Sequence, residues 1–310
     1  MKTKKFFSFA LMLIAVLGLT LSGCKKDKTE DPVADSSSLQ QLSNDETNLE
    51  AVTDETLNDV EAILSQPGLK STEVLPCNAT IDSTAVINDT ITIYITYNGL
   101  NCSGTRYRTG QVEIRRPYGV PWFVAGTTVR IKHINFTITK VTTGKSITLN
   151  SVKFIKNVSG GGVWQLGNQA QAIVHRVWGH VNITFDDNTT KMWNVARQKT
   201  YTGIFPHNLV LTNIGFGTQG DMTNLVVWGV NRQGEQFYTQ ILEPVVIRQV
   251  CGWDPVLGIK KHSIPGDNKS ATLTFGYNSN NQPVAPGQCP TKYKLDWEKN
   301  NQSGTIYLWL

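Results

Sequence analysis

The feature that most constrains the fold is an alternation of apolar and polar residues that runs from Cys77 to the end of the chain. Residues 90–97 read Thr-Ile-Thr-Ile-Tyr-Ile-Thr-Tyr, so the three isoleucines and the last tyrosine share one face of an extended strand. Similar short runs of Val, Ile, Thr and aromatic residues recur between turns rich in Gly, Asn, Asp and Pro. The pattern predicts an all-β region at 75–310, whose antiparallel strands form a β-sandwich or two related sandwich-like units.

A short internal repeat favours two units. Residues 92–98 (Thr-Ile-Tyr-Ile-Thr-Tyr-Asn) align without gaps with residues 272–278 (Thr-Leu-Thr-Phe-Gly-Tyr-Asn). In both copies one cysteine precedes the strand, another follows it, and a strand led by glycine comes next. We therefore place the two candidate units at about 75–200 and about 201–310.

The first 23 residues have the composition of an export signal. Three lysines among the first five residues precede an apolar run from Phe6 to about Leu21, which is short for a membrane span. The run ends in Leu-Ser-Gly-Cys, which resembles the lipobox of bacterial lipoproteins, where the signal is removed and the cysteine acylated. The resemblance implies a signal peptide at 1–23 and a palmitate-type lipid anchor on Cys24, because several acyl chains on one residue hold a protein firmly to a bilayer.

Residues 25–32 read Lys-Lys-Asp-Lys-Thr-Glu-Asp-Pro and resemble the Lys-plus-acid signal that directs lipoproteins of the Bacteroidota to the cell exterior. Lys28 interrupts the acidic run, so the match is partial. We expect a protein anchored by lipid in the outer membrane, at the cell surface rather than on the periplasmic face. The polar composition and the serine run at 36–38 predict a flexible stalk over 24–43.

One helix is expected between the stalk and the β region. Apolar residues recur at helical spacing from Leu49 to Leu64, Asn44 or Asp45 can cap the first turn, and Pro67 follows the last apolar residue. The pattern predicts an amphipathic helix at 44–66. We expect its apolar stripe to dock on the following domain or on a partner.

The charges divide the chain into an acidic and a basic part. Residues 25–74 carry 4 Lys and 12 Asp or Glu, net −8, whereas residues 75–310 carry 22 Lys or Arg and 12 acids, net +10. A basic domain could bind acidic polysaccharide, lipopolysaccharide phosphate or nucleic acid. The alternative is that the cations are scattered over the strands and partly neutralise the acidic segment. We favour the alternative because the cations do not cluster in sequence, and we expect no nucleic-acid partner.

The cysteines of the β region are an even set in a chain that is expected to be exported. In an oxidising compartment such a set indicates disulfides rather than a zinc site. Equivalent repeat units should use equivalent bonds, and both bonds are local along the chain. The predicted disulfides are Cys77–Cys102 and Cys251–Cys289.

The order of motifs in the β region resembles a family of uncharacterised Bacteroidota lipoproteins. The motifs are the Thr-Ile-Thr-Ile strand at 90–93 after Cys77, Asn-Cys at 101–102, Tyr-Arg-Thr-Gly at 107–110, Ile-Thr-Phe-Asp-Asp-Asn-Thr-Thr-Lys-Met-Trp at 183–193, Val-Cys-Gly-Trp at 250–253 and Gly-Thr-Ile at 304–306. The resemblance covers roughly residues 75–310, and the chain departs from it in an Asn- and Pro-rich insertion at 278–289. It implies the location and the β architecture and no particular chemistry.

A search for catalytic motifs gives no convincing candidate. Residues 215–220 fit the dinucleotide fingerprint, but a strand-like run follows them where that fingerprint needs a helix. His175 and His180 are five apart on a strand, which puts them on opposite faces and argues against a shared metal. Asp186 and Asp187 lie where a turn favours Asp. We therefore predict no catalytic residue, no cofactor and no metal site.

The best candidates for ligand contact are an arginine and three aromatic residues. Arg116, Tyr118 and Trp122 lie in one loop, where an aromatic face could stack on a sugar ring and a guanidinium could bind a carboxylate or phosphate. Trp164, after three glycines, is a second aromatic candidate. The alternative is that Tyr118 and Trp122 cap the end of the core.

Three functions remain open from the sequence. The leading hypothesis is a non-catalytic, lipid-anchored envelope protein whose β domain binds a glycan or another protein. The second is a structural component of an envelope assembly that engages a partner through the helix or an exposed strand edge. The third is an enzyme that acts on polysaccharide.

Overall fold

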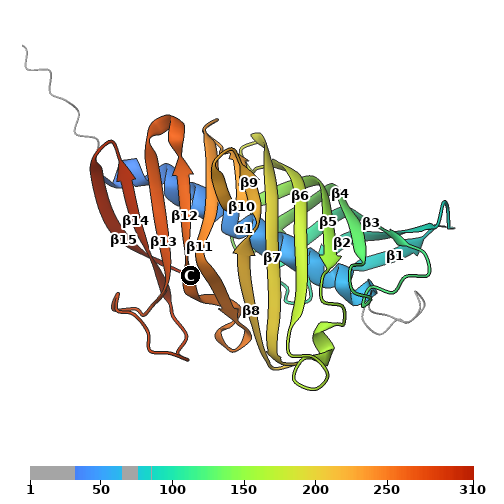
Figure 1. Ribbon diagram of the computed structural model, residues 1–310. Coiled ribbons are helices and arrows are strands. Elements are labelled where there is room, and N and C mark those ends of the chain that lie inside the picture. Colours follow the sequence, from blue (N-terminus) through green and yellow to red (C-terminus); the bar gives the residue numbers. More distant parts are fainter. Residues whose placement is uncertain (1–31, 65–75, 85) are drawn as a thin grey trace, which may run out of the picture.

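The computed structural model describes residues 32–64, 76–84 and 86–310, which form one α-helix and one large antiparallel sheet (Figure 1). The all-β class with a single preceding helix is confirmed. The expected signal peptide at 1–23, the expected lipidation site Cys24 and the first residues of the expected stalk lie outside the described residues. Within the described part of the chain, no helix is long and apolar enough to cross a membrane.

The sheet has fifteen strands in the described residues. They are β1 (Ala79–Ser83), β2 (Thr90–Leu100), β3 (Arg106–Pro117), β4 (Thr128–Lys140), β5 (Ser146–Asn157), β6 (Ile173–Thr184), β7 (Thr190–Ile204), β8 (Asn208–Gly215), β9 (Gly217–Gln219), β10 (Met222–Val230), β11 (Gln236–Arg248), β12 (Asp254–Ile264), β13 (Lys269–Tyr277), β14 (Lys292–Lys299) and β15 (Gln302–Trp309). Each strand up to β7, and again from β10 onward, pairs with the next along the chain, so short connections account for most of the topology.

The middle of the sheet departs from this simple order. The first part of β7 pairs with β10 and its later part pairs with β8, and β11 divides its pairing between the same two strands. Strands β8 and β10 therefore lie end to end in one position between β7 and β11. The proposed boundary near residue 200 falls inside β7, so the region is one continuous sheet and not two sandwich-like units.

The internal repeat corresponds to a hairpin and not to a whole unit. Residues 92–98 belong to β2 and residues 272–278 lie largely in β13, and each is the second strand of a hairpin enclosed by a disulfide. Both predicted bonds, Cys77–Cys102 and Cys251–Cys289, are present. The likeness ends there, because β3 pairs directly with β2, whereas β14 separates β13 from the strand that contains Gly304.

Alternation along the strands gives the sheet two different faces. We call the face that contacts the helix the inner face and the opposite one the outer face. The three isoleucines of 90–97 and Tyr97 are all buried on the inner face, as predicted. Ile93, Ile95 and Tyr97 join one core cluster that extends across the sheet to Leu295 and Trp297 of β14 and includes the apolar residues of the helix. Burial of this cluster is the main force that holds helix and sheet together.

The helix α1 (Pro32–Leu64) crosses the strands on the inner face, from the β14 side toward β1 (Figure 1). The prediction of a helix at 44–66 is therefore corrected at its start, and the later part of the expected stalk is helical. The physical reason is that Leu39 and Leu42 continue the apolar stripe and are buried in the common core, which outweighs the weak helix propensity of the serine run. Pro32 suits a first helical turn because it needs no hydrogen-bond acceptor there.

Candidate functional site

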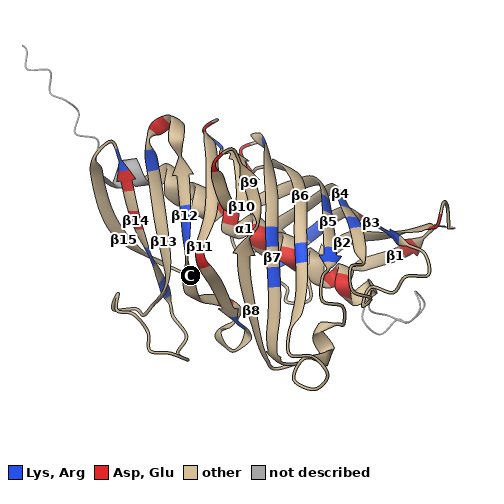
Figure 2. Ribbon diagram, in the orientation of Figure 1, with Lys and Arg blue, Asp and Glu red and all other residues tan. Residues whose placement is uncertain are grey.

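The acidic residues of α1 meet the cations of the inner face. Figure 2 shows Asp and Glu along the helix beside Lys and Arg of the neighbouring strands. The ion pairs with Lys and Arg are Asp45–Arg232, Glu46–Lys260, Glu50–Lys260, Glu50–Arg197, Asp54–Arg197, Asp54–Lys199, Glu55–Arg106, Glu55–Arg108 and Asp59–Arg108. The imidazoles of His175 and His262 lie beside Glu61 and Glu46. The acidic segment of the sequence is thus largely neutralised within the molecule by cations of the β strands. This agrees with the alternative in which the cations are scattered over the strands and partly neutralise the acidic segment.

Burial raises the pKa values of these carboxyl groups and the paired cations lower them, so the net direction differs from one carboxyl group to the next. Burial opposes ionisation of Glu50, but Arg197 and Lys260 outweigh it and lower the pKa of Glu50 to about 2. Burial raises the pKa of Asp59 although Arg108 and the Tyr97 hydroxyl stabilise its charged form. A buried ion pair contributes little net stability when intact, yet loss of one partner leaves a costly buried charge. The ion pairs of the inner face therefore fix the position of α1 on the sheet.

The predicted ligand loop does not present its tryptophan to solvent. Trp122 is 1% exposed, and its ring lies 5.2 Å from that of His175 between centroids. The Asn157 side chain donates a hydrogen bond of 3.1 Å to the Trp122 carbonyl and closes the loop over the end of the core. Tyr118 and Trp164 are exposed, but they do not join Trp122 in one site. The alternative that the sequence allows is that both Tyr118 and Trp122 cap the end of the core. It is correct for Trp122 and wrong for Tyr118.

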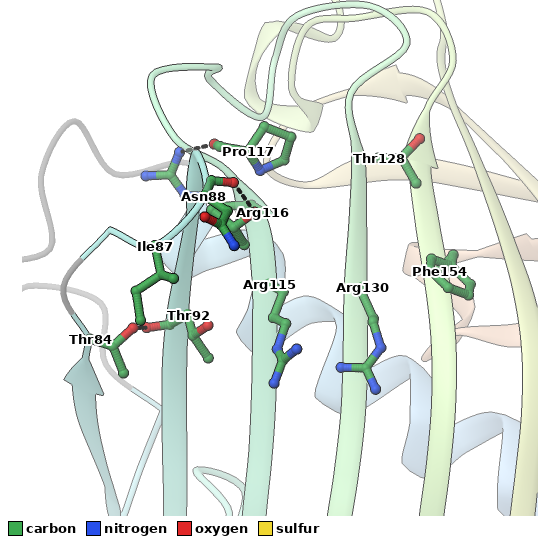
Figure 3. Close-up of a pocket in the computed structure, with 11 residues that line it drawn as sticks. Thr84, Ile87, Asn88, Thr92, Arg115, Arg116, Pro117, Thr128, Arg130 and Phe154 are labelled. Atoms are coloured by element: carbon green, nitrogen blue, oxygen red, sulfur yellow. Dashed lines mark hydrogen bonds between the residues drawn. The ribbon is translucent and has the colours of Figure 1, made fainter.

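Arg116 pairs with the inward-facing Ile91 near the end of β3, and from there it lines the rim of a depression on the outer face. We call it the arginine groove: it has a volume of about 520 Å³ and is open to solvent (Figure 3). It is lined by Thr84, Ile87, Asn88, Thr90, Thr92, Arg115, Arg116, Pro117, Thr128, Arg130 and Phe154. The lining comes from β2, β3, β4, β5 and the connection between β1 and β2. None of the described residues that line it is an acid, a histidine or a cysteine.

Strand register explains how the groove is assembled. Thr92 pairs with Arg115, Arg115 with Arg130, and Arg130 with Phe154, so these residues form one row across four strands. Phe154 in turn pairs with Trp178 of β6, and the two rings stack at 5.6 Å with an interplanar angle of 21°. Residues paired in adjacent strands point to the same face. The row thus presents a hydroxyl, two guanidiniums and an aromatic surface in one line.

One buried carboxylate holds two of the guanidiniums. Glu113, 5% exposed, accepts from Arg115 Nε at 2.9 Å and from Arg130 Nη1 at 2.7 Å. Half of the Arg115 side chain remains exposed. Arg116 Nη1 donates to the Val120 carbonyl at 3.3 Å, which fixes the third guanidinium at the rim. Three arginines balanced by one carboxylate leave a positive surface whose unused N–H groups can bind an anion.

Further cations flank the groove on the outer face. Register places Lys132 beside Glu113, and Lys156 next to Thr128 and Arg176. Sequence reasoning missed this cluster because its members are brought together by four strands and are far apart along the chain. The available signal was the spacing of two in Glu113-x-Arg115 and Arg130-x-Lys132, which puts both charges of each pair on one strand face.

Two other sequence interpretations can be compared with the structure. His175 is buried on the inner face and His180 is exposed on the outer one, so the prediction that they lie on opposite faces is confirmed. Residues 215–220 cover the end of β8, β9 and the following turn, and strand β10 follows them. Asp186 and Asp187 occupy the turn between β6 and β7, where both contact Arg232.

Comparison of the chain with protein-family models, with curated proteins and with solved structures found no match.

Proposed function

We propose that the chain is a non-catalytic, lipid-anchored protein of the outer membrane that binds an anionic glycan in the arginine groove. The observation that carries the proposal is the row of Arg115, Arg130 and Phe154 across β3, β4 and β5, with Arg116 at its rim. The lipobox at Cys24 and the resemblance to Bacteroidota lipoproteins support the anchor and its display at the cell surface.

The groove suits a sugar that carries a carboxylate or a sulfate. Arginine binds such groups through paired N–H donors, and Glu113 holds Arg115 and Arg130 in fixed positions before a ligand arrives. The threonine hydroxyls can donate to and accept from sugar hydroxyls. Phe154 offers an apolar ring face beside them.

The same geometry favours binding over hydrolysis. Cleavage of a glycosidic bond normally uses two carboxyl groups on opposite sides of that bond. Glu113 is nearly buried and is engaged by two arginines, so it is poorly placed to exchange protons with a sugar.

The proposal predicts glycan binding that depends on the exposed arginines. We expect the full chain to bind polygalacturonate or chondroitin sulfate, to bind dextran much more weakly, and to lose affinity as salt rises. The variant Arg115→Gln with Arg116→Gln should weaken binding by roughly tenfold or more, because each charge-assisted hydrogen bond contributes about 1.5–3 kcal/mol. Isothermal titration calorimetry on the full chain in detergent measures this.

The matched control removes two cations elsewhere. Lys140→Gln with Lys261→Gln makes the same change in net charge outside the groove and should leave affinity unchanged. Equal affinity of the groove variant and the unsubstituted chain would remove the groove as a site. Equal binding of polyglutamate and of the anionic glycans would show that the groove recognises charge alone, and glycan specificity would be rejected.

The proposed location has its own test. Protease added to intact cells should cleave the β region while a periplasmic control protein survives. Protection of the β region would reject display at the cell surface, and absence of palmitate label that depends on Cys24 would reject the anchor.

A further inference from the structure

The strand β15 leaves one side of the sheet open for pairing. Among the described residues β15 pairs with β14 alone, and the eight positions of that ladder follow without a register shift. The strand is regular and extended, so its outward N–H and C=O groups form an evenly spaced row. Such a row is a template for another strand.

This edge lacks the features that usually prevent pairing. Residues 302–309 contain no charged residue and no proline, and the ladder to β14 has no bulge. The opposite edge is different, because β1 has only five residues, carries Asp82, and begins two residues after the disulfide-bonded Cys77. Short length and charge block edge pairing, so β1 is protected and β15 is not.

The side chains of β15 are complementary in size to those of a second β15 that runs antiparallel to it. Residues 303–305 are small (Ser-Gly-Thr) and residues 307–309 are large (Tyr-Leu-Trp), with Ile306 between them. We propose that β15 pairs antiparallel with β15 of a second copy of this chain, centred on Ile306. Each large residue then lies opposite a small one, and no like charges face each other.

The backbone supports the same centre. Leu310 N–H donates to the Thr291 carbonyl at 3.0 Å, so the backbone of Leu310 faces the β14 side. Because this direction alternates along a strand, the odd-numbered residues of β15 turn their N–H and C=O groups outward. A centre on Ile306 pairs Thr305 with Tyr307 of the second copy, and the N–H and C=O groups of both residues point outward. Ser303 likewise pairs with Trp309 of the second copy.

Both faces of the edge accept this arrangement. Ile306 and Leu308 already pack partly against the inner core, so pairing extends that core across the two copies. The indole of Trp297 covers Gly304, so Leu308 of the second copy meets this ring on the inner face. On the outer face Trp309 is 66% exposed, and pairing places the backbone of the second copy beside it. The interface is a two-fold one in which each copy contributes the same strand.

The mass of the full chain in detergent tests the proposal. Sedimentation equilibrium should show two chains per particle, and Thr305→Lys should convert the dimer to a monomer. Thr305 lies on the outer face, where its hydroxyl donates to Asp296, and the substitution places a lysine near its own counterpart across the two-fold axis. Thr80→Lys, on the opposite edge strand β1, is the matched control and should remain a dimer. A monomer for the unsubstituted chain, or a dimer that Thr305→Lys leaves intact, overturns the proposal.

Cysteine crosslinking tests the register and does not depend on stability. Ile306→Cys lies opposite itself in a non-hydrogen-bonded pair, where the Cα atoms are about 4.5 Å apart and a disulfide can form. Thr305→Cys lies opposite Tyr307 of the second copy and should not crosslink to itself. Mild oxidation followed by non-reducing electrophoresis should give a dimer band for the first variant only. The unsubstituted chain, which keeps every other cysteine, is the control for crosslinking elsewhere. A band for Thr305→Cys, or none for Ile306→Cys, overturns the register.

Discussion

At the scale of single residues, Lys153 is the most unusual group of the inner face. It lies on β5, is 2% exposed, and belongs to the largest fully buried side chains of the protein. Burial lowers its pKa to about 7, and Arg197 and Lys199 act in the same direction against the favourable charge of Asp54. Lys153 therefore binds its proton more weakly in the folded protein than in the unfolded chain.

This shift predicts a specific dependence of stability on pH. Between about pH 7 and about pH 10 the unfolded chain holds a proton on Lys153 that the folded protein has lost, so the free energy of unfolding rises with pH across that window. Lys153→Met should remove this rise, which is at most about 1.4 kcal/mol per pH unit, and should stabilise the protein most near neutral pH. Thermal unfolding of both proteins from pH 7 to pH 10 measures the difference. Parallel profiles would contradict the prediction.

At the scale of elements, α1 shows what periodicity can and cannot predict. The existence of the helix, its apolar stripe and its docking on the β region could be predicted, because Leu49, Val52, Leu57 and Val60 recur at helical spacing and all are buried. Its start could not, because residues 32–43 are mostly polar and only Leu39 and Leu42 extend the stripe. Burial of two leucines is a tertiary effect that local propensity does not contain.

The docking of α1 can be tested on one helical turn. Val60→Asp puts a carboxylate in a fully buried position and should destabilise the protein by about 3 kcal/mol or more, because the charge finds no designed partner there. Asn58→Asp adds the same charge at an exposed position and should change the free energy of unfolding by less than about 0.5 kcal/mol. Urea denaturation compares the two variants. Equal stabilities would show that α1 does not depend on its apolar face.

The candidate site was predictable only in part. Arg116 could be named from the sequence because it lies beside aromatic residues and proline, although the expected loop is wrong for Arg116, which is the next-to-last residue of β3. Arg115, Arg130 and Phe154 could not be joined to it, because their proximity depends on the register of β3, β4 and β5. The candidate ligand contact at Trp122 is wrong, because the residue is buried; the sequence of a loop tryptophan does not distinguish a cap of the core from a ligand contact.

At the scale of the whole molecule, the continuous sheet and its two disulfides determine how the protein unfolds. The bonds enclose hairpins toward opposite ends of the strand order, with sequence separations of 25 and 38. A loop of that size corresponds to about 3.5–4 kcal/mol of lost chain entropy in the unfolded state. Strands β7 and β11 both pair with β8 and β10, and these ladders join the strands before β8 to those after β10.

We therefore expect one cooperative transition. Replacing either disulfide by serines, as Cys77→Ser with Cys102→Ser or Cys251→Ser with Cys289→Ser, should lower stability by about 3–4 kcal/mol while the protein still unfolds in a single step. Calorimetry of both double variants tests this. Two separate transitions, with only one of them shifted by each variant, would support two independent units in place of one sheet.

The direction of α1 has a mechanical consequence. The helix runs across the strands from the β14 side toward β1, and its carboxylates engage Lys260, Arg197 and Arg108 at successive points along the axis (Figures 1 and 2). A force directed along this axis loads the contacts together in shear, whereas a force across the axis breaks them one at a time. The contact between α1 and the sheet is therefore strong against force along the helix and weak against force across it.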